Sequence, residues 1–285
     1  MTTAWILPGG ASLGAVQVGM LGALYDAGVV PDLLVGTSVG AMNAAYLGLH
    51  PGAEGVADLA RLWTSLRRRD MVKLRPTQAL AALAGHGVAL FDRSGLVRAL
   101  AAELGNTRLE DLALRVAVVA ADVVSGEPAV LRQGPALQAV LASSAMPGIF
   151  APVPWEGQLL MDGSVAADIP LAECRGLGAD EIWVLTTAPA KVGPPRGALG
   201  LATHAFAVVT GAASRAQLEL ARQQGVVHVL PPPVAQAPDI FDVSRSQALI
   251  DESYQTTAAW LAASPDAVVS PGQRDSIDAN PGAVG

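Results

Sequence analysis

The chain has 285 residues, of which 51% are apolar and 15% are charged, a composition that predicts one large or two small globular domains and excludes an intrinsically disordered protein. The net charge of −7 argues against nucleic acid as a partner. No apolar run reaches the ~20 residues that cross a bilayer, and the first residues lack a basic stretch, so we expect neither a membrane span nor a secretory leader. Cys174 is the sole cysteine of the sequence, so an intrachain disulfide is impossible and we expect a soluble, cytoplasmic protein.

The first predicted unit is a strand, a loop and a helix. Ala4–Leu7 is a short apolar run typical of a buried strand. A mostly apolar helix is predicted from about Leu13 to Asp26, and Gly28 is placed to cap its C-terminal end. The glycine-rich loop Gly9–Gly14 lies between strand and helix, so its free N–H groups can face an anion.

Three interpretations of this loop remain open. A dinucleotide site would need the spacing G-x-G-x-x-G and an acidic residue after the second strand, and this chain has neither. An oxyanion hole would use the N–H groups of Gly10 and Ala11 to bind the tetrahedral intermediate of acyl transfer. A tight turn that simply needs glycine is compatible with either site.

A G-x-S-x-G pattern spans Gly36–Gly40, between a predicted strand at Asp32–Val35 and a predicted helix that begins at Val39. A serine at a strand-to-helix turn is expected to project into solvent with its hydroxyl free, as an acyl-transfer nucleophile requires, which makes Ser38 the candidate. Gly36 and Gly40 allow the sharp turn and the close approach of neighbouring elements. The alternative is a turn of small residues between two core elements.

The order of these elements predicts their arrangement in space. Two strands joined by one buried helix form a βαβ unit, so we expect parallel strands and a right-handed crossover. The glycine loop and the Ser38 turn then both lie beyond the carboxyl ends of adjacent strands, where open α/β sheets place their ligands.

The rest of the chain continues the alternation of strands and helices. A more polar, helical segment at about 53–106 is predicted to cap the site, and the tail at 263–285, rich in Pro, Ser, Gly and Asp, is predicted to be flexible, which leaves one domain over 1–262. Further strands are predicted at Val116–Ala121, Ala129–Leu131, Gln158–Met161, Glu181–Thr186 and Val226–Leu230. Further helices are predicted at Ala136–Ser144, Ala198–Gln224 and Ser246–Ala262.

The general base is the next question. An α/β-hydrolase places its nucleophile after several strands and follows it with an acid and a histidine, whereas Ser38 comes after the second strand. Asp162 stands at the tip of a predicted strand, before Gly163. An ordinary Asp has a pKa of about 3.9 and is a poor base near neutrality, but burial could raise that pKa. A turn-forming Asp-Gly is the alternative.

None of the histidines fits the role of base better than Asp162. They occupy polar helix ends, loops, a strand interior and a helix, where ordinary surface or core histidines are found: His50, His86, His204 and His228.

Together these pieces resemble the patatin-like phospholipase family. The matching segments occur in the family's order: Gly9–Gly14, Gly36–Ala44, Ala142–Pro147 and Asp162–Ser164. The resemblance implies a three-layer α/β/α sandwich with a mainly parallel sheet, and a Ser–Asp dyad that needs no histidine, metal or organic cofactor. By position, Ser38 is the nucleophile and Asp162 the base. The amides of Gly10 and Ala11 form the oxyanion hole, supported by the motif glycines Gly9, Gly14, Gly36, Gly40 and Gly163.

Three positions depart from the family pattern. Ala11 stands where a third glycine is usual, and it can still donate its N–H if its φ is ordinary. Leu13 replaces the usual Arg or Lys, so we expect no cation for an anionic group at that point. Ser164 stands where Gly or Ala is usual. The carboxyl-ester part of the activity is therefore better supported than the phospholipid part.

The sequence thus predicts a serine acyl hydrolase that acts on lipid-like carboxyl esters. A lipid-binding or scaffolding protein that keeps the fold without turnover is one alternative, and a nucleotide-binding α/β protein is another. Basic residues between apolar ones, at Arg67–Arg69, Lys73 and Arg75, could hold the capping segment at an anionic membrane surface. A solvated helix end is an equally good interpretation of that stretch.

Overall fold

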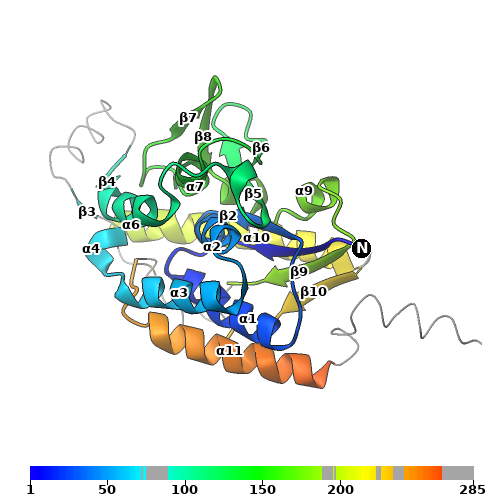
Figure 1. Cartoon of the computed structure of the whole chain (residues 1–285). Coiled ribbons are helices and arrows are strands. Elements are labelled where there is room, and N and C mark those ends of the chain that lie inside the picture. Colours follow the sequence, from blue (N-terminus) through cyan, green and yellow to red (C-terminus); the bar gives the residue numbers. More distant parts are fainter. Residues whose placement is uncertain are drawn as a thin grey trace, which may run out of the picture.

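A mixed sheet forms the centre of the computed structural model, which describes residues 1–71, 73–74, 89–187, 195, 197–222, 226–233 and 241–264 (Figure 1). Within these residues its strand order is β10-β9-β1-β2-β5-β8-β7, and β6 also pairs with β5. The strands are β1 (Thr3–Leu7), β2 (Leu33–Thr37), β5 (Arg115–Asp122), β6 (Pro128–Leu131), β7 (Val153–Trp155), β8 (Gln158–Asp162), β9 (Glu181–Leu185) and β10 (Val226–Leu230).

The sheet has a parallel part and an antiparallel part. Strands β10, β9, β1, β2 and β5 pair in parallel, whereas β6, β8 and β7 join through antiparallel pairs. Every residue of β1, β2 and β9 is buried, as expected for parallel strands covered on both faces. The predicted parallel pairing of the first two strands is confirmed, with Ala4 opposite Leu33.

Helices cover both faces of the sheet. They are α1 (Gly14–Asp26), α2 (Val39–Leu49), α3 (Gly52–Ser65), α4 (Arg68–Met71), α6 (Ser94–Leu104), α7 (Ala136–Ser143), α8 (Ser164–Ala167), α9 (Leu171–Gly176), α10 (Gly197–Arg222) and α11 (Ser246–Ala263). Side chains alternate along a strand, so Trp5 and Leu7 pack with α1, α2 and α11, while Ala4 and Ile6 pack with α8 and α9 on the other face. The predicted three-layer sandwich is confirmed.

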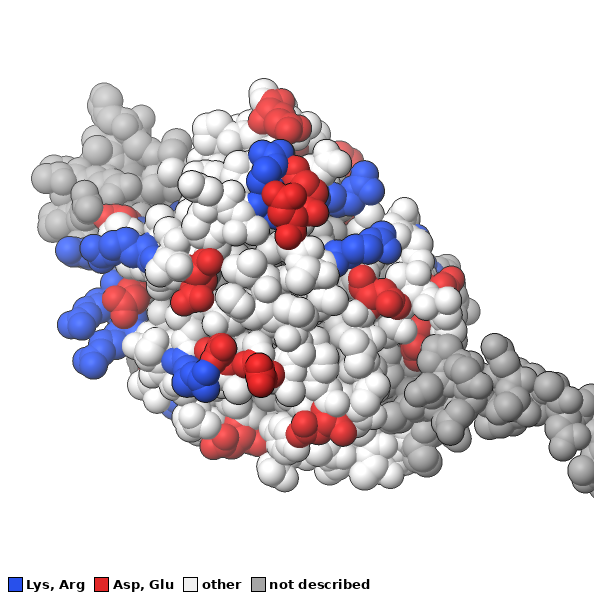
Figure 2. All heavy atoms as spheres, viewed as in Figure 1, with Lys and Arg blue, Asp and Glu red and all other residues white. Residues whose placement is uncertain are grey.

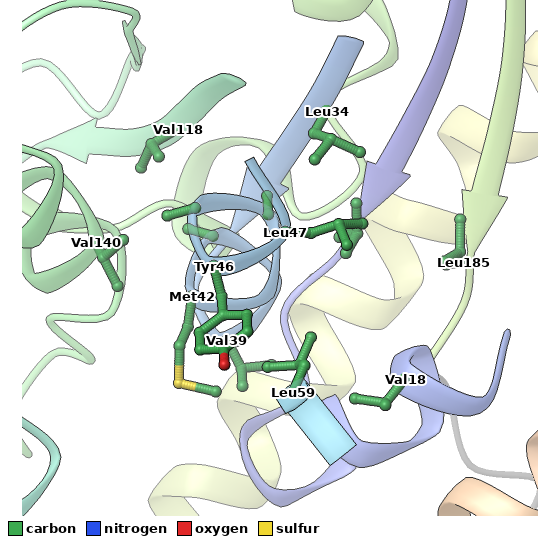
Figure 3. Packing of buried hydrophobic residues seen from close by; sticks show 14 of the residues in the cluster. Val18, Leu34, Val39, Met42, Tyr46, Leu47, Leu59, Val118, Val140 and Leu185 are labelled. Atoms are coloured by element: carbon green, nitrogen blue, oxygen red, sulfur yellow. The ribbon is translucent and has the colours of Figure 1, made fainter. Parts of the chain in front are cut away.

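Helix α2 carries the serine turn into the middle of the core. All of its residues from Val39 to Gly48 are buried, which explains why the helix is apolar on every side. Figure 3 shows Leu47 of this helix between Leu34 of the sheet and Leu59 of α3. Helices α1, α3 and α11 pack against one another beneath it (Figure 1).

Several predicted boundaries change in the structure. A short 3-10 turn at Ala11–Leu13 precedes α1, and β2 extends to Thr37. The predicted cap contains α3, α4 and α6 but also a small strand pair, β3 (Lys73–Leu74) and β4 (Phe91–Asp92), so it is not helical throughout. Positions 75–88, including Arg75 and His86, and the tail from 265 lie outside the described residues. No helix in the described part of the chain is long and apolar enough to cross a membrane.

Candidate active site

Ser38 occupies a strained turn between β2 and α2. Its backbone has φ 54° and ψ −121°, a region that residues with a side chain rarely adopt. The Ser38 N–H donates to Ser143 Oγ at 2.7 Å, and the Ser143 hydroxyl donates to the Val119 carbonyl at 2.6 Å. These two bonds tie the Ser38 turn to the last residue of α7 and, through it, to β5.

The expectation that Ser38 projects into solvent is wrong. The residue is only 8% exposed, and it faces a cavity lined by residues of α4, α6 and α7. A local motif identifies a strand-to-helix turn, but the depth of that turn depends on elements far away in the sequence.

Close packing of the turn explains its second glycine. A Cβ added to Gly40 would lie 1.9 Å from the carbonyl oxygen of Leu7, at the end of β1. A backbone atom cannot move aside as a flexible side chain can, so a larger residue here would push α2 away from the sheet.

We therefore expect Gly40→Ala to lower the free energy of unfolding by ~3 kcal/mol or more, because overpacking against backbone strains the whole α2 contact. Gly176→Ala is the matched control, since a Cβ at Gly176 at the end of α9 would meet nothing within 4 Å. Urea unfolding of both variants tests the prediction. Equal unfolding midpoints for Gly40→Ala and the parent would contradict it.

Asp162 lies against Ser38 although the two residues are 124 positions apart. Its Oδ2 accepts the Ser38 hydroxyl at 2.8 Å, and its Oδ1 accepts the N–H of Ser164 at 2.9 Å. Asp162 ends β8, which runs antiparallel beside β5, with Asp162 opposite Ala120. The side chain is 1% exposed. The structure thus brings together the two residues predicted as nucleophile and base, and their catalytic role remains a prediction.

Burial changes the chemistry of this carboxylate. Desolvation raises the pKa of Asp162 to about 6, assisted by the negative charge of Asp168 and opposed by hydrogen bonds from Ser164 and Ser38. The carboxylate is ionised at neutral pH, and its pKa is much closer to neutrality than that of an ordinary Asp. It is therefore suited to accept a proton from Ser38.

Gly163 serves packing and does not form the kind of turn that an Asp-Gly pair suggests. It has φ −64° and caps the N-terminus of α8, so its backbone would suit any residue. A Cβ there would lie 2.0 Å from the carbonyl oxygen of Val119. The glycine is required because β5 passes directly beside it, which brings Asp162 within reach of Ser38.

The predicted oxyanion loop lies next to the serine. A Cβ added to Gly9 would be 3.3 Å from the Cβ of Ser38, and Ala11 lines the same cavity as Ser38. Gly10 has φ 156°, and Ala11 has φ 51°. Ala11 therefore lacks the ordinary φ that was expected, and its left-handed backbone accounts for a glycine being favoured there. Its N–H is present in either conformation, so its part in the oxyanion hole remains a prediction.

A buried chain of amides anchors this loop, and the sequence analysis did not identify it. Gln17 donates to the carbonyl oxygen of Pro8 at 2.7 Å, Asn43 donates to Gln17 at 2.8 Å, and the Trp63 indole donates to Asn43 at 2.9 Å. The three side chains are fully buried. Single polar residues inside otherwise apolar helices were the available signal, since buried polar groups need partners.

A small cavity of about 50 Å³ opens beside the Ser38–Asp162 pair. Its remaining walls are mostly apolar and include three methionines, whose flexible side chains can adapt to different occupants. The lining residues are Ala11, Val39, Met42, Met71, Leu100, Val140, Leu141, Ser144, Met146, Phe150 and Phe241. Walls of this kind favour an acyl chain over a polar group.

Arg93 contacts two of the residues that line this cavity. The Arg93 guanidinium donates to the carbonyl oxygen of Leu141 at 2.6 Å and lies over the ring of Phe150, 5.5 Å from its centroid. Burial lowers the pKa of Arg93 to about 10, and the charge of Asp162 opposes that effect, so the group stays charged at neutral pH. The sequence analysis did not identify this residue.

The three described histidines lie away from the dyad. His228 pairs with Glu181 at 2.9 Å and stacks on Trp183, and His50 lies 3.8 Å from Glu103. His204 is on α10. None of the three is among the residues that line the cavity.

Comparisons with known proteins agree with the motifs. An uncharacterized NTE family protein of Mycobacterium tuberculosis (strain ATCC 25618 / H37Rv) is 29% identical over 193 residues, which are 67% of this chain and 51% of that protein. Lysophospholipase nte1 of Aspergillus terreus is 27% identical over 196 residues, 67% of this chain and 12% of that protein. The chain therefore spans about half the length of the mycobacterial relative and a much smaller part of the fungal one.

Among solved structures, VipD from Legionella pneumophila is similar with a TM-score of 0.47 and 14% identity, covering 90% of this chain and 67% of that chain. A family model described as patatin-like phospholipase matches residues 6–175, more than half of the sequence. The chain belongs to the patatin-like phospholipase family.

Proposed function

We propose that the protein is a serine acyl hydrolase that cleaves carboxyl esters of lipids, as a lipase, esterase or phospholipase A does, through a dyad of Ser38 and Asp162. The observation that carries this proposal is the 2.8 Å hydrogen bond from the Ser38 hydroxyl to the buried Asp162 carboxylate, beside an apolar cavity. Family membership and the name of the fungal relative, a lysophospholipase, support lipid esters as the substrates.

The proposed reaction has two halves. Ser38 Oγ attacks the acyl carbon while Asp162 takes its proton, and the N–H groups of Gly10 and Ala11 stabilise the oxyanion. Asp162 then gives the proton to the leaving alcohol, which leaves an acyl-enzyme. Water attacks this ester while Asp162 accepts a proton from the water. The bond between the acyl carbon and Ser38 Oγ then breaks, Asp162 returns the proton to Ser38 Oγ, and the carboxylic acid is released.

Substrate preference follows from the walls of the cavity and from Leu13. Apolar lining favours the acyl chain, and Leu13 packs partly buried against the core without supplying charge near the oxyanion loop. We infer a preference for neutral over anionic groups at that loop. We also propose a reducing, cytoplasmic location, because Cys174 is the sole cysteine of the sequence and no intrachain disulfide can form.

Labelling with a fluorophosphonate, followed by a panel of neutral and phospholipid esters, tests the proposal. A serine hydrolase would be modified at Ser38 and would turn over at least one ester of the panel. The alternative, a lipid-binding or scaffolding protein that retains the fold, would bind lipid but would be neither labelled nor active.

Contact with a membrane surface is a separate proposal. Arg67, Arg68 and Arg69 at α4 are exposed, and Met71 of the same helix lines the cavity. Figure 2 shows Lys and Arg side chains gathered at the edge of the molecule where Figure 1 places α4. Basic residues near a bilayer contribute ~1 kcal/mol each on an anionic surface.

We expect a variant with Gln in place of Arg67, Arg68 and Arg69 to lose most of its binding to vesicles that contain phosphatidylserine, at low salt. Co-sedimentation of the parent and the variant measures this, with neutral phosphatidylcholine vesicles as the control. Equal binding of parent and variant, or binding by neither, would show that the patch is only a solvated surface.

A further inference from the structure

A second carboxylate, Asp168, lies directly behind the dyad. It is the C-terminal cap of the short helix α8, six residues after Asp162, and it is partly buried. Its two oxygens accept from opposite sides: Oδ1 accepts the N–H of Gly9 at 3.0 Å, and Oδ2 accepts the hydroxyl of Ser214 on α10 at 3.2 Å. Asp168 therefore holds the start of the predicted oxyanion loop.

Ser164 connects the two carboxylates. Its N–H donates to Asp162 Oδ1 at 2.9 Å, and its hydroxyl lowers the pKa of both Asp162 and Asp168. The crowding around Gly9 shows how tightly these groups converge. A Cβ at Gly9 would lie 2.5 Å from Ser164 Oγ and 2.8 Å from Asp168 Oδ1. The serine that replaces the family's usual Gly or Ala thus places a hydroxyl on the same side of Gly9 as the Asp168 carboxylate.

We propose that Asp168 is a positioning residue of the active site: its carboxylate holds the Gly9 amide and, together with the Ser164 hydroxyl, controls how Asp162 accepts a proton from Ser38. The inference rests on the proposed function, because it assigns this regulation to the same reaction.

The electrostatics give the two neighbours of Asp162 opposite effects. The negative charge of Asp168 raises the pKa of Asp162, whereas the hydrogen bond from the Ser164 hydroxyl lowers it. Burial raises the pKa of Asp168 itself, and its bonds from Ser164, Gly9 and Ser214 lower it. The charge of Asp162 also acts on a cation, since it raises the pKa of Arg93 against the larger, lowering effect of burial. Two like charges that interact in a buried site favour a proton on one of them.

Two variants should therefore move the pH profile in opposite directions. Asp168→Asn removes the charge but keeps an oxygen for the Gly9 N–H. The acid limb of the profile, the pH range over which kcat/KM falls as the solution becomes more acidic, should therefore move to lower pH. Ser164→Ala removes the hydroxyl but keeps the backbone N–H, so the acid limb should move to higher pH. Glu181→Gln is the matched control, because it removes a buried carboxylate on β9 that pairs with His228, and its acid limb should stay at the parent position.

The measurement is the pH dependence of ester hydrolysis, repeated as the pH dependence of the rate at which a fluorophosphonate labels Ser38. Opposite shifts of Asp168→Asn and Ser164→Ala support the proposal. Unmoved limbs, or shifts in the same direction, overturn it. If Asp168→Asn does not fold, Ser164→Ala alone decides by the direction of its shift.

Failure of this inference can be told apart from failure of the proposed function. A parent protein that is not labelled at Ser38 overturns both. A parent that is labelled and active, with variants whose acid limbs do not move, overturns only the role of Asp168 and Ser164.

Discussion

Ser38→Ala is expected to lower ester hydrolysis by ~10⁴-fold or more and to abolish fluorophosphonate labelling, because the nucleophile of both reactions is gone. The chain should remain folded, since the change removes one oxygen and leaves the packing of the turn intact. Hydrolysis of a neutral ester, with circular dichroism of the same sample, provides the measurement.

Ser38→Gly is the matched variant for this experiment. It should be equally inactive, but more stable than Ser38→Ala by up to ~1 kcal/mol, because glycine adopts the φ of 54° without strain. Turnover that survives in a folded Ser38→Ala protein would contradict the mechanism. A less stable Ser38→Gly variant would show that the turn is not strained.

Asp162→Asn is expected to remove ~10³-fold or more of the activity, because the amide cannot take the proton of Ser38. In the parent, kcat/KM should fall as the pH is lowered through about 6, where Asp162 becomes protonated. His204→Ala and His228→Ala should keep most of the activity. Kinetics over a range of pH for the four proteins provide the measurement.

Asp162→Asn, which should remove activity, should not reduce stability at alkaline pH. The pKa of Asp162 is raised on folding, so its contribution to stability is present below its unfolded pKa and is lost as the pH rises through about 6. At pH 8 the free energy of unfolding of the Asn variant should equal that of the parent or exceed it by up to ~3 kcal/mol. If His204→Ala or His228→Ala abolished activity while Asp162→Asn kept it, a catalytic triad with a histidine base would replace the proposed dyad.

The parts of the site that sequence could predict are those that local patterns encode. The strand, turn and helix around Ser38 follow from neighbouring residues, and so does the strand that ends at Asp162. The burial of Ser38 and the raised pKa of Asp162 could not be derived in the same way, because both depend on residues brought together by the completed sheet. The links from Trp63 to Pro8 and from Asp168 to Gly9 are likewise contacts between distant segments.

The antiparallel part of the sheet shows the same limit. Alternating strands and helices predict parallel pairing, and the five neighbouring strands β10, β9, β1, β2 and β5 follow that rule. Strands β6, β8 and β7 reverse direction, and the short β7 was not predicted because its three residues, Val153–Trp155, include a proline and only one buried side chain. The left-handed φ of Ala11 could not be predicted for a different reason, because alanine has no preference for that conformation.

The hydrogen bond between Ser38 and Asp162 joins residues 124 positions apart, so we expect the proposed chemistry to appear late in folding. Closing a chain segment of that length costs about 4 kcal/mol in entropy, and β8 can carry Asp162 to Ser38 only after it has docked antiparallel on β5. Helices α1 and α2 have no such requirement. During refolding, we therefore expect recovery of hydrolysis to report the closure of the sheet, and recovery of helical signal to report only the first segments of the fold.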